Sequence, residues 1–377
     1  MAALSGRGAA GQEAGHGRAA DPGHVRGSRV LVTGAYGLLG GWLVRALLAG
    51  GAEVTVISRD DRPRSGLVLM GLQPHVNVVH GDIASPGLTD RTIAEYEIDT
   101  VFHLAAQTLV PTANRAPSST FESNITGTWL VLEACRVHGV RRVIVAASDK
   151  AYGPHASLPY LETHALNPVF PYDVSKAATD MIARSYWHTW GVPVAVTRFA
   201  NLYGGGDFNA SRLIPELVSA ALAGRDPVIR SDGSPERDFL YVEDAAAAYL
   251  AIAGALVPVG NEGAEGGEVE GTVDGEETSA GNGAAGPAAG EAFNAGGGAP
   301  HRIVDVANLV CALAGTGVTP EIRGSGTPSG EIDRQWVDHS KLTALTGWRP
   351  LVRLEDGLRA TLDWYREHAA PRSHRAR

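Results

Sequence analysis

The chain has only two cysteines among its 377 residues, Cys135 and Cys311, which excludes a disulfide framework and a multi-cysteine metal cluster. So few thiols are typical of a reducing cytoplasm, which we predict as the location, and no metal site is predicted. No apolar run approaches the length of a membrane span. The first 27 residues also lack the apolar centre of a signal peptide, so we expect residues 1–27 to form a disordered tail.

Basic residues are also in the minority, because 32 Lys and Arg stand against 41 Asp and Glu. Most of the net charge of −9 comes from residues 261–291, which contain eight carboxylates and no Lys or Arg. The remainder is nearly neutral, so the bulk charge predicts no nucleic-acid partner. The same Gly/Ala/Glu-rich region cannot bury enough apolar surface to fold, and we predict a disordered insert over residues 258–291.

Short β-branched strands alternate with amphipathic helices through the first 200 residues. The strands are expected at residues 29–33, 53–57, 76–79, 100–104, 142–146 and 194–198. Helices are expected after Gly40, over residues 120–138 and over residues 172–190. This alternation predicts an α/β fold with a Rossmann-like, doubly wound parallel sheet, forming a dinucleotide-binding domain over residues 28–200.

The alternation breaks down after Asn201. We expect helices over residues 213–223 and 244–255, and two short strands within residues 227–241. This half is too irregular to form an independent core. Residues 201–368 are therefore predicted to be a smaller mixed α/β lobe that binds substrate and closes over the carboxyl edge of the sheet, followed by a tail over residues 369–377.

Three glycines connect the first strand to the first helix. Gly34 permits the tight turn, Gly37 lets the backbone approach a pyrophosphate, and Gly40 lets the helix and strand pack closely. A glycine-rich turn without a ligand is the alternative. The strand before it and the helix after it are the context that a dinucleotide site requires.

Two proton-transfer sets follow in the chain. Tyr172 and Lys176 are four residues apart, so they lie on one face of a helix, where the ammonium can lower the pKa of the phenol and make it a base. An ordinary surface pair is the alternative. Asp149 and Lys150 follow Ser148 at the end of a strand and add a second acid/base pair, which alcohol oxidation alone would not need.

These motifs resemble the extended short-chain dehydrogenase/reductases, in particular the NAD-dependent epimerase/dehydratase family. The resemblance covers about residues 28–255 and 291–368. It implies that Tyr172 takes a hydroxyl proton, that Lys176 also holds the cofactor ribose, and that Ser148 hydrogen-bonds the reacting oxygen.

The same resemblance implies the cofactor site. Asp82 lies where the family contacts adenine, residues 103–106 line the nicotinamide side, and Asn124 braces the active-site strand. The implied cofactor-binding residues are Gly34, Tyr36, Gly37, Leu38, Gly40, Arg59, Asp82, Ile83, Leu104, Ala105, Ala106, Tyr172 and Lys176.

The type of nicotinamide depends on the end of the second strand. Ser58 replaces the acidic residue that would hold a ribose diol, and Arg59 and Asp60 follow it. Arg59 could accept the 2′-phosphate of NADP or could be a solvated surface residue. We predict NAD, with NADP as the alternative.

The Ser148-Asp149-Lys150 sequence resembles CDP-glucose 4,6-dehydratases, whereas sugar 4-epimerases usually have small or neutral residues after the Ser or Thr. Further segments share this likeness; they are residues 171–176, 198–207, 211–215, 229–233 and 237–244. The resemblance implies an NAD-dependent hydro-lyase that oxidises C4, eliminates water across C5 and C6, and returns the hydride to C6.

Elimination explains the second acid/base pair. A C4 ketone acidifies the C5 proton, so one group must remove that proton while another protonates the departing C6 hydroxyl. Asp149, with a pKa raised by burial, suits the acid role. Lys150, with a pKa lowered by desolvation and the cofactor charge, could assist at C5, or could only neutralise Asp149.

The substrate side depends mainly on the resemblance. It implies that Asn201 contacts a phosphate and that Arg212 and Arg237 bind the diphosphate and nucleotide; surface salt bridges are the alternative. Gln107 is included in the predicted substrate-binding set, and Glu331 and Gln335 lie in a segment that can close over the nucleotide. The glycine turn departs from the CDP-glucose pattern, so CDP, UDP, GDP and dTDP sugars all stay open.

Two alternative functions are a nucleotide-sugar 4-epimerase and a nicotinamide-binding regulator that has lost its chemistry. Asp149 and Lys150 argue against the first, and the retained Tyr172 and Lys176 argue against the second. In relatives, the equivalents of the helices at residues 120–138 and 173–190 form a dimer's four-helix bundle. These helices carry apolar and aromatic positions, including Trp129, Trp187 and Trp190, for which ordinary packing against the sheet is the alternative. We predict a homodimer.

Overall fold

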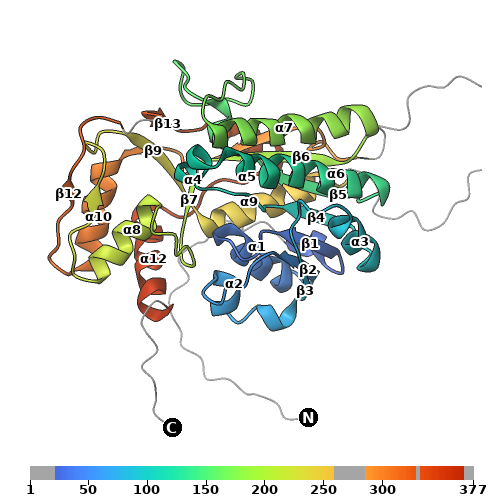
Figure 1. The fold of residues 1–377 in the computed structure, drawn as a ribbon, viewed down its shortest axis with the longest axis horizontal. Helices are drawn as coiled ribbons and strands as arrows, with labels where there is room; N and C mark the ends of the chain where they lie inside the picture. Colours follow the sequence, from blue (N-terminus) through green and yellow to red (C-terminus); the bar gives the residue numbers. More distant parts are fainter. Residues whose placement is uncertain (1–21, 259–284, 328–331, 369–377) are drawn as a thin grey trace, which may run out of the picture.

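The computed structural model describes residues 22–258, 285–327 and 332–368, which Figure 1 shows as an α/β body with a smaller lobe at its left. The body is built on a seven-stranded sheet in the order β10-β6-β5-β4-β1-β2-β3, and every pairing within it is parallel. Its strands are β1 (Arg29–Thr33), β2 (Glu53–Ser58), β3 (Asn77–His80), β4 (Thr100–His103), β5 (Arg142–Ala146), β6 (Val194–Phe199) and β10 (Ala292–Ala295). The order from β3 to β6 is that of the Rossmann fold, so the predicted fold class is confirmed.

Helices cover both faces of this sheet, as Figure 1 shows. On one face α1 (Leu38–Ala49) packs against α9 (Val242–Ala255), and on the other α6 (Gly127–Val137) packs against α3 (Leu88–Glu95) and α7 (Pro171–Trp190). Side chains of β1 divide between the two layers, because Val30 and Val32 join the α1/α9 core and Leu31 joins the opposite core. Such two-sided burial is what makes the strands uniformly apolar.

Short elements connect these layers. They are η1 (Pro22–Val25), α2 (Gly66–Leu69), η2 (Gln73–His75), α4 (Val110–Arg115), α5 (Pro117–Phe121), η3 (Glu122–Thr126), η4 (Asp149–Tyr152) and α11 (Ser340–Thr346). The helix expected over residues 120–138 is interrupted by η3, a π-helical turn that carries Asn124. Such turns are often found at functional sites.

The smaller lobe has its own mixed sheet, in which β9 pairs with β7, β11 and β13. Its elements are β7 (Asn201–Tyr203), α8 (Leu213–Leu222), β8 (Val228–Ile229), β9 (Glu236–Tyr241), β11 (Pro300–Arg302), α10 (Ile303–Ala314), β12 (Glu321–Ile322), β13 (Arg334–Gln335) and α12 (Leu354–His368). Leu217, Val306 and Leu358, one from each helix, are buried together in the core of this lobe.

The boundary between the two parts is less simple than predicted. β10 and α9 follow Asn201 in sequence, yet β10 pairs with β6 of the main sheet and α9 packs on α1. The apolar pattern of residues 292–295 is too short to reveal this pairing from sequence. The body therefore takes segments from both halves of the chain.

The predicted disordered tail and the predicted disordered insert both include residues that belong to the folded core. Val25, inside the expected tail, is fully buried against the α1/α9 core, and so is Ala288, inside the expected insert. Residues 1–21, 259–284 and 369–377 lie outside the described residues.

Cys135 and Cys311 are both free and buried. Within the described ranges, no helix is long and apolar enough to cross a membrane, and no group of side chains is arranged to hold a metal ion.

A buried ion pair joins α7 to β6. Arg198 donates from Nε and Nη2 to the two carboxylate oxygens of Asp180, at 2.7 and 2.9 Å, and both side chains are almost fully buried. Arg198 also donates to the hydroxyl of Tyr152 at 3.0 Å. We expect Asp180→Ala to lower the free energy of unfolding by about 3–5 kcal/mol, because it leaves a buried guanidinium without its counter-charge.

Urea denaturation would measure this loss. Glu355→Ala is the matched control, because Glu355 pairs with Arg359 on an exposed face of α12 and should change the free energy of unfolding by about 0.5 kcal/mol or less. A similar small change for Asp180→Ala would contradict the prediction.

Candidate active site

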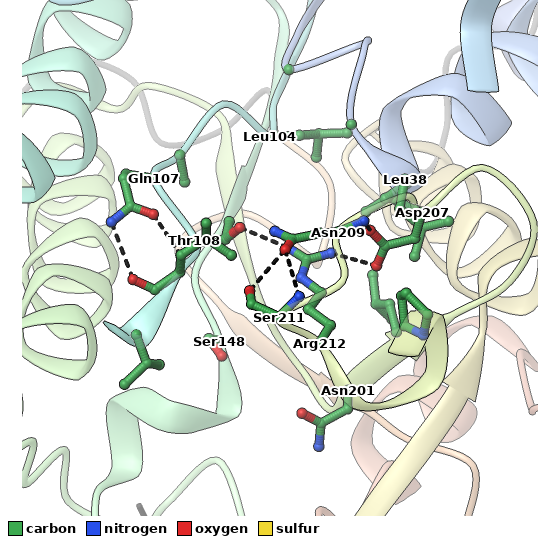
Figure 2. Close-up of a pocket in the computed structure, with 18 of the residues that line it drawn as sticks. Leu38, Leu104, Gln107, Thr108, Ser148, Asn201, Asp207, Asn209, Ser211 and Arg212 are labelled. Carbon is green, nitrogen blue, oxygen red and sulfur yellow. Dashed lines mark hydrogen bonds and ion pairs between the residues drawn. The ribbon is translucent and has the colours of Figure 1, made fainter. Parts of the chain in front are cut away.

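A cavity of about 1230 Å³ lies at the carboxyl ends of the main strands and is lined from the other side by the smaller lobe. Figure 2 shows part of it, with Leu104 and Ser148 contributed by the body and Asp207, Ser211 and Arg212 by the lobe. Ligands of open α/β sheets bind at this edge, where the strand order reverses. The predicted catalytic residues and the implied cofactor-binding residues line this cavity, and so do Gln107, Asn201, Arg212 and Arg237, whereas His103 and Gln335 are not among its lining residues.

The glycine turn leaves no room for side chains. A Cβ on Gly34, which has φ +76°, would lie 2.7 Å from the backbone N of Ala105, and a Cβ on Gly40 would lie 2.3 Å from the Gly34 carbonyl oxygen. Gly37 is the N-cap of α1 and lacks any side-chain cap. The free N–H groups of that helix start suit an anionic group such as a pyrophosphate.

Arg59, in the segment after β2, lies between the carboxylates of Asp60 and Asp82. Arg59 donates from Nε and Nη2 to Asp60 Oδ2 at 3.0 and 2.9 Å, and its Nη1 lies 3.8 Å from Asp82 Oδ2. Asp60 raises the pKa of Arg59, and Arg59 in turn lowers that of Asp60. Asp82 also accepts a bond from the backbone N of Ala84 at 2.9 Å.

The end of β4 is held by a buried polar network. Thr33 Oγ1 accepts bonds from the backbone N of Leu104 and of Ala105, at 3.2 and 3.1 Å. His103 lies between two threonines, with Nδ1 2.8 Å from Thr33 Oγ1 and Nε2 3.0 Å from Thr128 Oγ1. These bonds fix the backbone of residues 104–106 where the resemblance implies nicotinamide contacts.

Asn124 and Gln107 brace each other. Asn124 Oδ1 accepts from the backbone N of Gln107 at 2.7 Å, and its Nδ2 donates to Ser175 Oγ on α7 at 2.9 Å. The side chain of Gln107 donates to Thr120 Oγ1 at 3.1 Å and accepts from the backbone N of Leu109 at 2.5 Å. Figure 2 shows Gln107 turned into these contacts, so a substrate contact, which stays a prediction, would have to replace one of them.

Ser148, Tyr172 and Lys176 meet at the end of β5. Ser148 Oγ donates to Asp149 Oδ1 at 3.0 Å and accepts from the backbone N of Lys150 at 3.2 Å. Lys176 is buried and donates to the Ala146 carbonyl oxygen at 2.7 Å. Burial lowers the pKa of Lys176 to about 8. The three side chains predicted as a triad all line the same cavity.

The expectation that Lys176 lowers the pKa of Tyr172 needs correction. Burial raises the pKa of Tyr172 to about 12, and the cation that chiefly opposes this shift is Arg212, whereas Asp149 adds to it. Tyr172 and Lys176 do lie one turn apart on a single helix, α7, as predicted. The sequence could not show that desolvation would dominate, or that a cation from the other lobe would face the phenol.

Asp149 and Lys150 occupy η4 beside this set. Asp149 is 3% exposed, and its Oδ2 atom has no hydrogen-bond partner among the described residues. Burial raises the pKa of Asp149, although the charge of Lys150 opposes the shift. Lys150 Nζ donates to Gln335 Oε1 at 3.0 Å, across to β13 of the lobe. The carboxyl group thus has the raised pKa that the acid role requires.

Arg212 bridges the two parts of the molecule. Its Nη1 donates to Asp207 Oδ2 at 2.8 Å within the lobe, and its Nη2 donates to Thr108 Oγ1 of the body at 2.6 Å, as Figure 2 shows. Asp207 lies in the segment 198–207 that shares the family likeness, but that likeness does not predict a contact with Arg212, and Thr108 belongs to no such segment. The guanidinium is thus fixed at the mouth between body and lobe.

The other predicted substrate residues lie on or next to β9. Arg237 is buried and donates from Nη1 to the carbonyl oxygens of Asp333 and Glu236, at 2.8 and 2.9 Å. Asn201 donates from Nδ2 to the Asp238 carbonyl oxygen at 3.1 Å. Glu331 lies outside the described residues.

The described residues fit a nicotinamide dinucleotide. The glycine cradle would be filled by any Cβ at Gly34 or Gly40, the start of α1 has N–H groups for the pyrophosphate, and Lys176 lies beside the β4 and β5 ends for a ribose. A family model described as the NAD dependent epimerase/dehydratase family matches residues 30–262. The chain belongs to this family.

Curated members of the family resemble the chain along most of its length. A dTDP-glucose 4,6-dehydratase of Actinoplanes is 30% identical over 347 residues, which cover 90% of this chain and 98% of the relative. A trifunctional UDP-glucose 4,6-dehydratase of Arabidopsis thaliana is also 30% identical and covers 90% of this chain. The chain spans 47% of the length of that plant protein.

Solved structures of family members share the fold. The dTDP-glucose 4,6-dehydratase of Streptomyces venezuelae, solved with NAD bound, has a TM-score of 0.74 at 28% identity and covers 90% of this chain and 97% of its own. A UDP-glucose 4-epimerase of Thermotoga maritima has a TM-score of 0.75 at 25% identity, covering 90% and 99%. The prediction of an extended short-chain dehydrogenase/reductase of the NAD-dependent epimerase/dehydratase family is confirmed.

The buried histidine of this family member predicts a pH dependence. Burial lowers the pKa of His103 from its ordinary 6.5 to about 3, so between these values the unfolded chain binds a proton that the folded chain does not. The free energy of unfolding should therefore fall as the pH falls through this window, by about 1.4 kcal/mol per pH unit for this group.

Urea denaturation at several pH values, comparing the wild type with His103→Gln, would isolate the effect. The variant lacks the titrating group, so the difference in free energy of unfolding between the two proteins should change with pH as stated. A difference that is constant from pH 6.5 downward would contradict the prediction.

Proposed function

We propose that this protein is an NAD-dependent nucleotide-sugar 4,6-dehydratase, which converts a nucleoside-diphosphate hexose into its 4-keto-6-deoxy form. The observation that carries the proposal is the buried Asp149, which borders the cavity beside the Ser148, Tyr172 and Lys176 set and whose Oδ2 atom has no hydrogen-bond partner within the described part of the chain. Oxidation of an alcohol needs only that set. A second acid in the same cavity is required when water must leave.

The redox step uses the Tyr172 side of the cavity. A bound nicotinamide would supply the acceptor for a hydride from C4 and return it to C6. Tyr172 takes the proton of the C4 hydroxyl, and the charge of Arg212 favours the phenolate against the effect of burial. Ser148 can bond the same oxygen, and Lys176 can hold the cofactor ribose.

The elimination uses Asp149. Once C4 is a ketone, the C5 proton is acidic and the C6 hydroxyl needs a proton in order to leave as water. The raised pKa of Asp149 keeps its carboxyl group protonated closer to neutral pH than that of an exposed aspartate. No side chain or backbone group in residues 22–258, 285–327 and 332–368 hydrogen-bonds Oδ2, which leaves that oxygen available to the substrate.

Arg212, Arg237 and Asn201 are the proposed contacts for the substrate phosphates. Both guanidinium groups line the cavity, and arginine suits bidentate phosphate binding. The Asp149-Lys150 pair makes CDP-glucose the first sugar nucleotide to test. The dTDP- and UDP-glucose dehydratases among the relatives make those sugars the next.

We propose NAD as the cofactor. Arg59, the one side chain after β2 that the sequence suggested for a 2′-phosphate, is bonded to Asp60 and close to Asp82. A 2′-phosphate there would displace the Asp60 bond and approach two carboxylates, and like charges repel. NAD, which lacks this phosphate, avoids both costs, and NAD is the cofactor bound in the Streptomyces venezuelae relative.

Product analysis tests the function. Purified protein incubated with CDP-, dTDP-, UDP- and GDP-glucose should convert one of them to a product whose sugar mass is lower by one water, with no accumulation of NADH.

Asp149→Asn should still oxidise C4, while water loss slows by about 10²–10⁴-fold, the contribution typical of a general acid. The nucleotide released on denaturation should be NAD.

Asp305→Asn, an exposed change on α10, is the control and should keep the wild-type rate. An unchanged sugar mass would indicate a 4-epimerase, and sugar-nucleotide binding without turnover would indicate a regulator. Equal loss of C4 oxidation and water loss in Asp149→Asn would contradict the acid role, and released NADP would contradict the cofactor.

We further propose that the protein is a homodimer formed through α6 and α7. Trp129 on α6 and Met181 and Trp190 on α7 are 42%, 65% and 54% exposed, unusually high for large apolar side chains on two packed helices. Trp187, expected at this face, instead packs against Gly290 of its own chain.

Analytical ultracentrifugation should give the mass of two chains. Met181→Glu should shift the protein toward monomer, because it places a charge in the apolar contact, whereas Ile322→Glu, at a 48% exposed position on β12 of the lobe, should not. A monomeric wild type would reject the interface.

A further inference from the structure

A further carboxyl group borders the cavity and has no role in the chemistry described so far. Asp173 follows Tyr172 directly on α7, lines the cavity, and is only 2% exposed. The start of α7 packs against η4, which carries Asp149 and Lys150. Asp173 therefore belongs to the same group of side chains as the proposed acid.

Burial and the neighbouring charges decide the protonation state of Asp173. Burial raises the pKa of Asp173 to about 6; the charge of Lys150 opposes the shift and Asp149 adds to it. A carboxylate with such a pKa is ionised at neutral pH and is still basic enough to accept a proton.

Lys150 is held as a fixed cation. Its ammonium acts on Asp149 and on Asp173, and it donates to Gln335 Oε1 at 3.0 Å. Gln335 is fully buried on β13, so this contact comes from an ordered part of the lobe. An ionised Asp173 favours the charged form of the neighbouring ammonium, and a charged ammonium has no lone pair with which to remove a proton.

We propose that Asp173, not Lys150, removes the C5 proton of the sugar. This inference depends on the proposed dehydratase function. The C5–H bond breaks and its electron pair forms the C5=C6 double bond, while the C6–O bond breaks and its electrons leave with the hydroxyl. Asp149 gives its proton to that hydroxyl, so water departs, and Asp173 keeps the C5 proton.

This assignment divides the work by charge. Asp149 begins protonated and ends ionised, whereas Asp173 begins ionised and ends protonated, so the net charge of the pair is conserved across the step. Lys150 takes no part in the transfer of either proton. The alternative is that Asp173 only balances the charge of Lys150, in which case proton removal at C5 does not need it.

Exchange at C5 separates these two roles. The NAD-loaded enzyme is incubated in D₂O with the nucleotide glucose that the wild type dehydrates, and deuterium at C5 is measured by mass, together with the formation of reduced nicotinamide. Asp173→Asn should still form reduced nicotinamide, while C5 exchange and water loss fall by about 10²–10⁴-fold. Lys150→Met should keep most of the C5 exchange.

Two further variants complete the experiment. Asp173→Ser, which fits the same space, is a second test if the Asn variant does not oxidise C4. Asp363→Asn, exposed on α12 and paired with Arg366, is the surface control and should match the wild type.

The outcomes are distinct. Wild-type dehydration with undiminished C5 exchange in the Asp173 variants overturns the assignment of Asp173 alone, and so does loss of exchange in Lys150→Met with exchange retained in Asp173→Asn. A wild type that removes no water from any of the four sugar nucleotides overturns the proposed function, and this inference with it.

Discussion

Desolvation at the carboxyl edge of the main sheet is the constraint on which the site depends. Tyr172, Lys176 and Asp149 are all buried there, and burial is the largest cause of the pKa shift of each. The shift moves each group toward its neutral form, since a low dielectric disfavours charge. For Lys176 and Asp149 this shift brings the pKa closer to neutral pH, whereas for Tyr172 it moves the pKa further from neutral pH, and the charge of Arg212 opposes it.

Burial of this kind needs a cover, and the smaller lobe supplies it. Arg212 reaches Thr108 of the body, and Gln335 reaches Lys150, so the lobe contributes polar contacts as well as apolar surface. Arg212 thereby joins Asp207 of the lobe to Thr108 of the body, and Gln335 joins β13 to Lys150. The lobe is therefore part of the electrostatics of the site, in addition to binding substrate.

Hydrogen bonds within the body also hold the residues at the carboxyl edge of the sheet in place. Asn124, carried by the π-helical turn η3, is hydrogen-bonded to both Gln107 and Ser175, and Thr33 holds the backbone at the end of β4.

Local motifs revealed the glycine turn, the Tyr172–Lys176 spacing and the acid/base pair, because each depends on residues close together in sequence. β10, the role of Val25 and the contact between Arg212 and Thr108 could not be found in that way, because each joins segments that are far apart.

The sequence alone determined the fold class, the dinucleotide turn and the set of side chains available for proton transfer, since strand–helix alternation and short spacings are local properties. Only the tertiary structure decided how those side chains are charged. Tyr172 has a raised pKa because the lobe and helices exclude water from it, and Asp173 joins Asp149 because α7 packs on η4. Burial and proximity arise from packing between distant segments, so only the folded chain determines them.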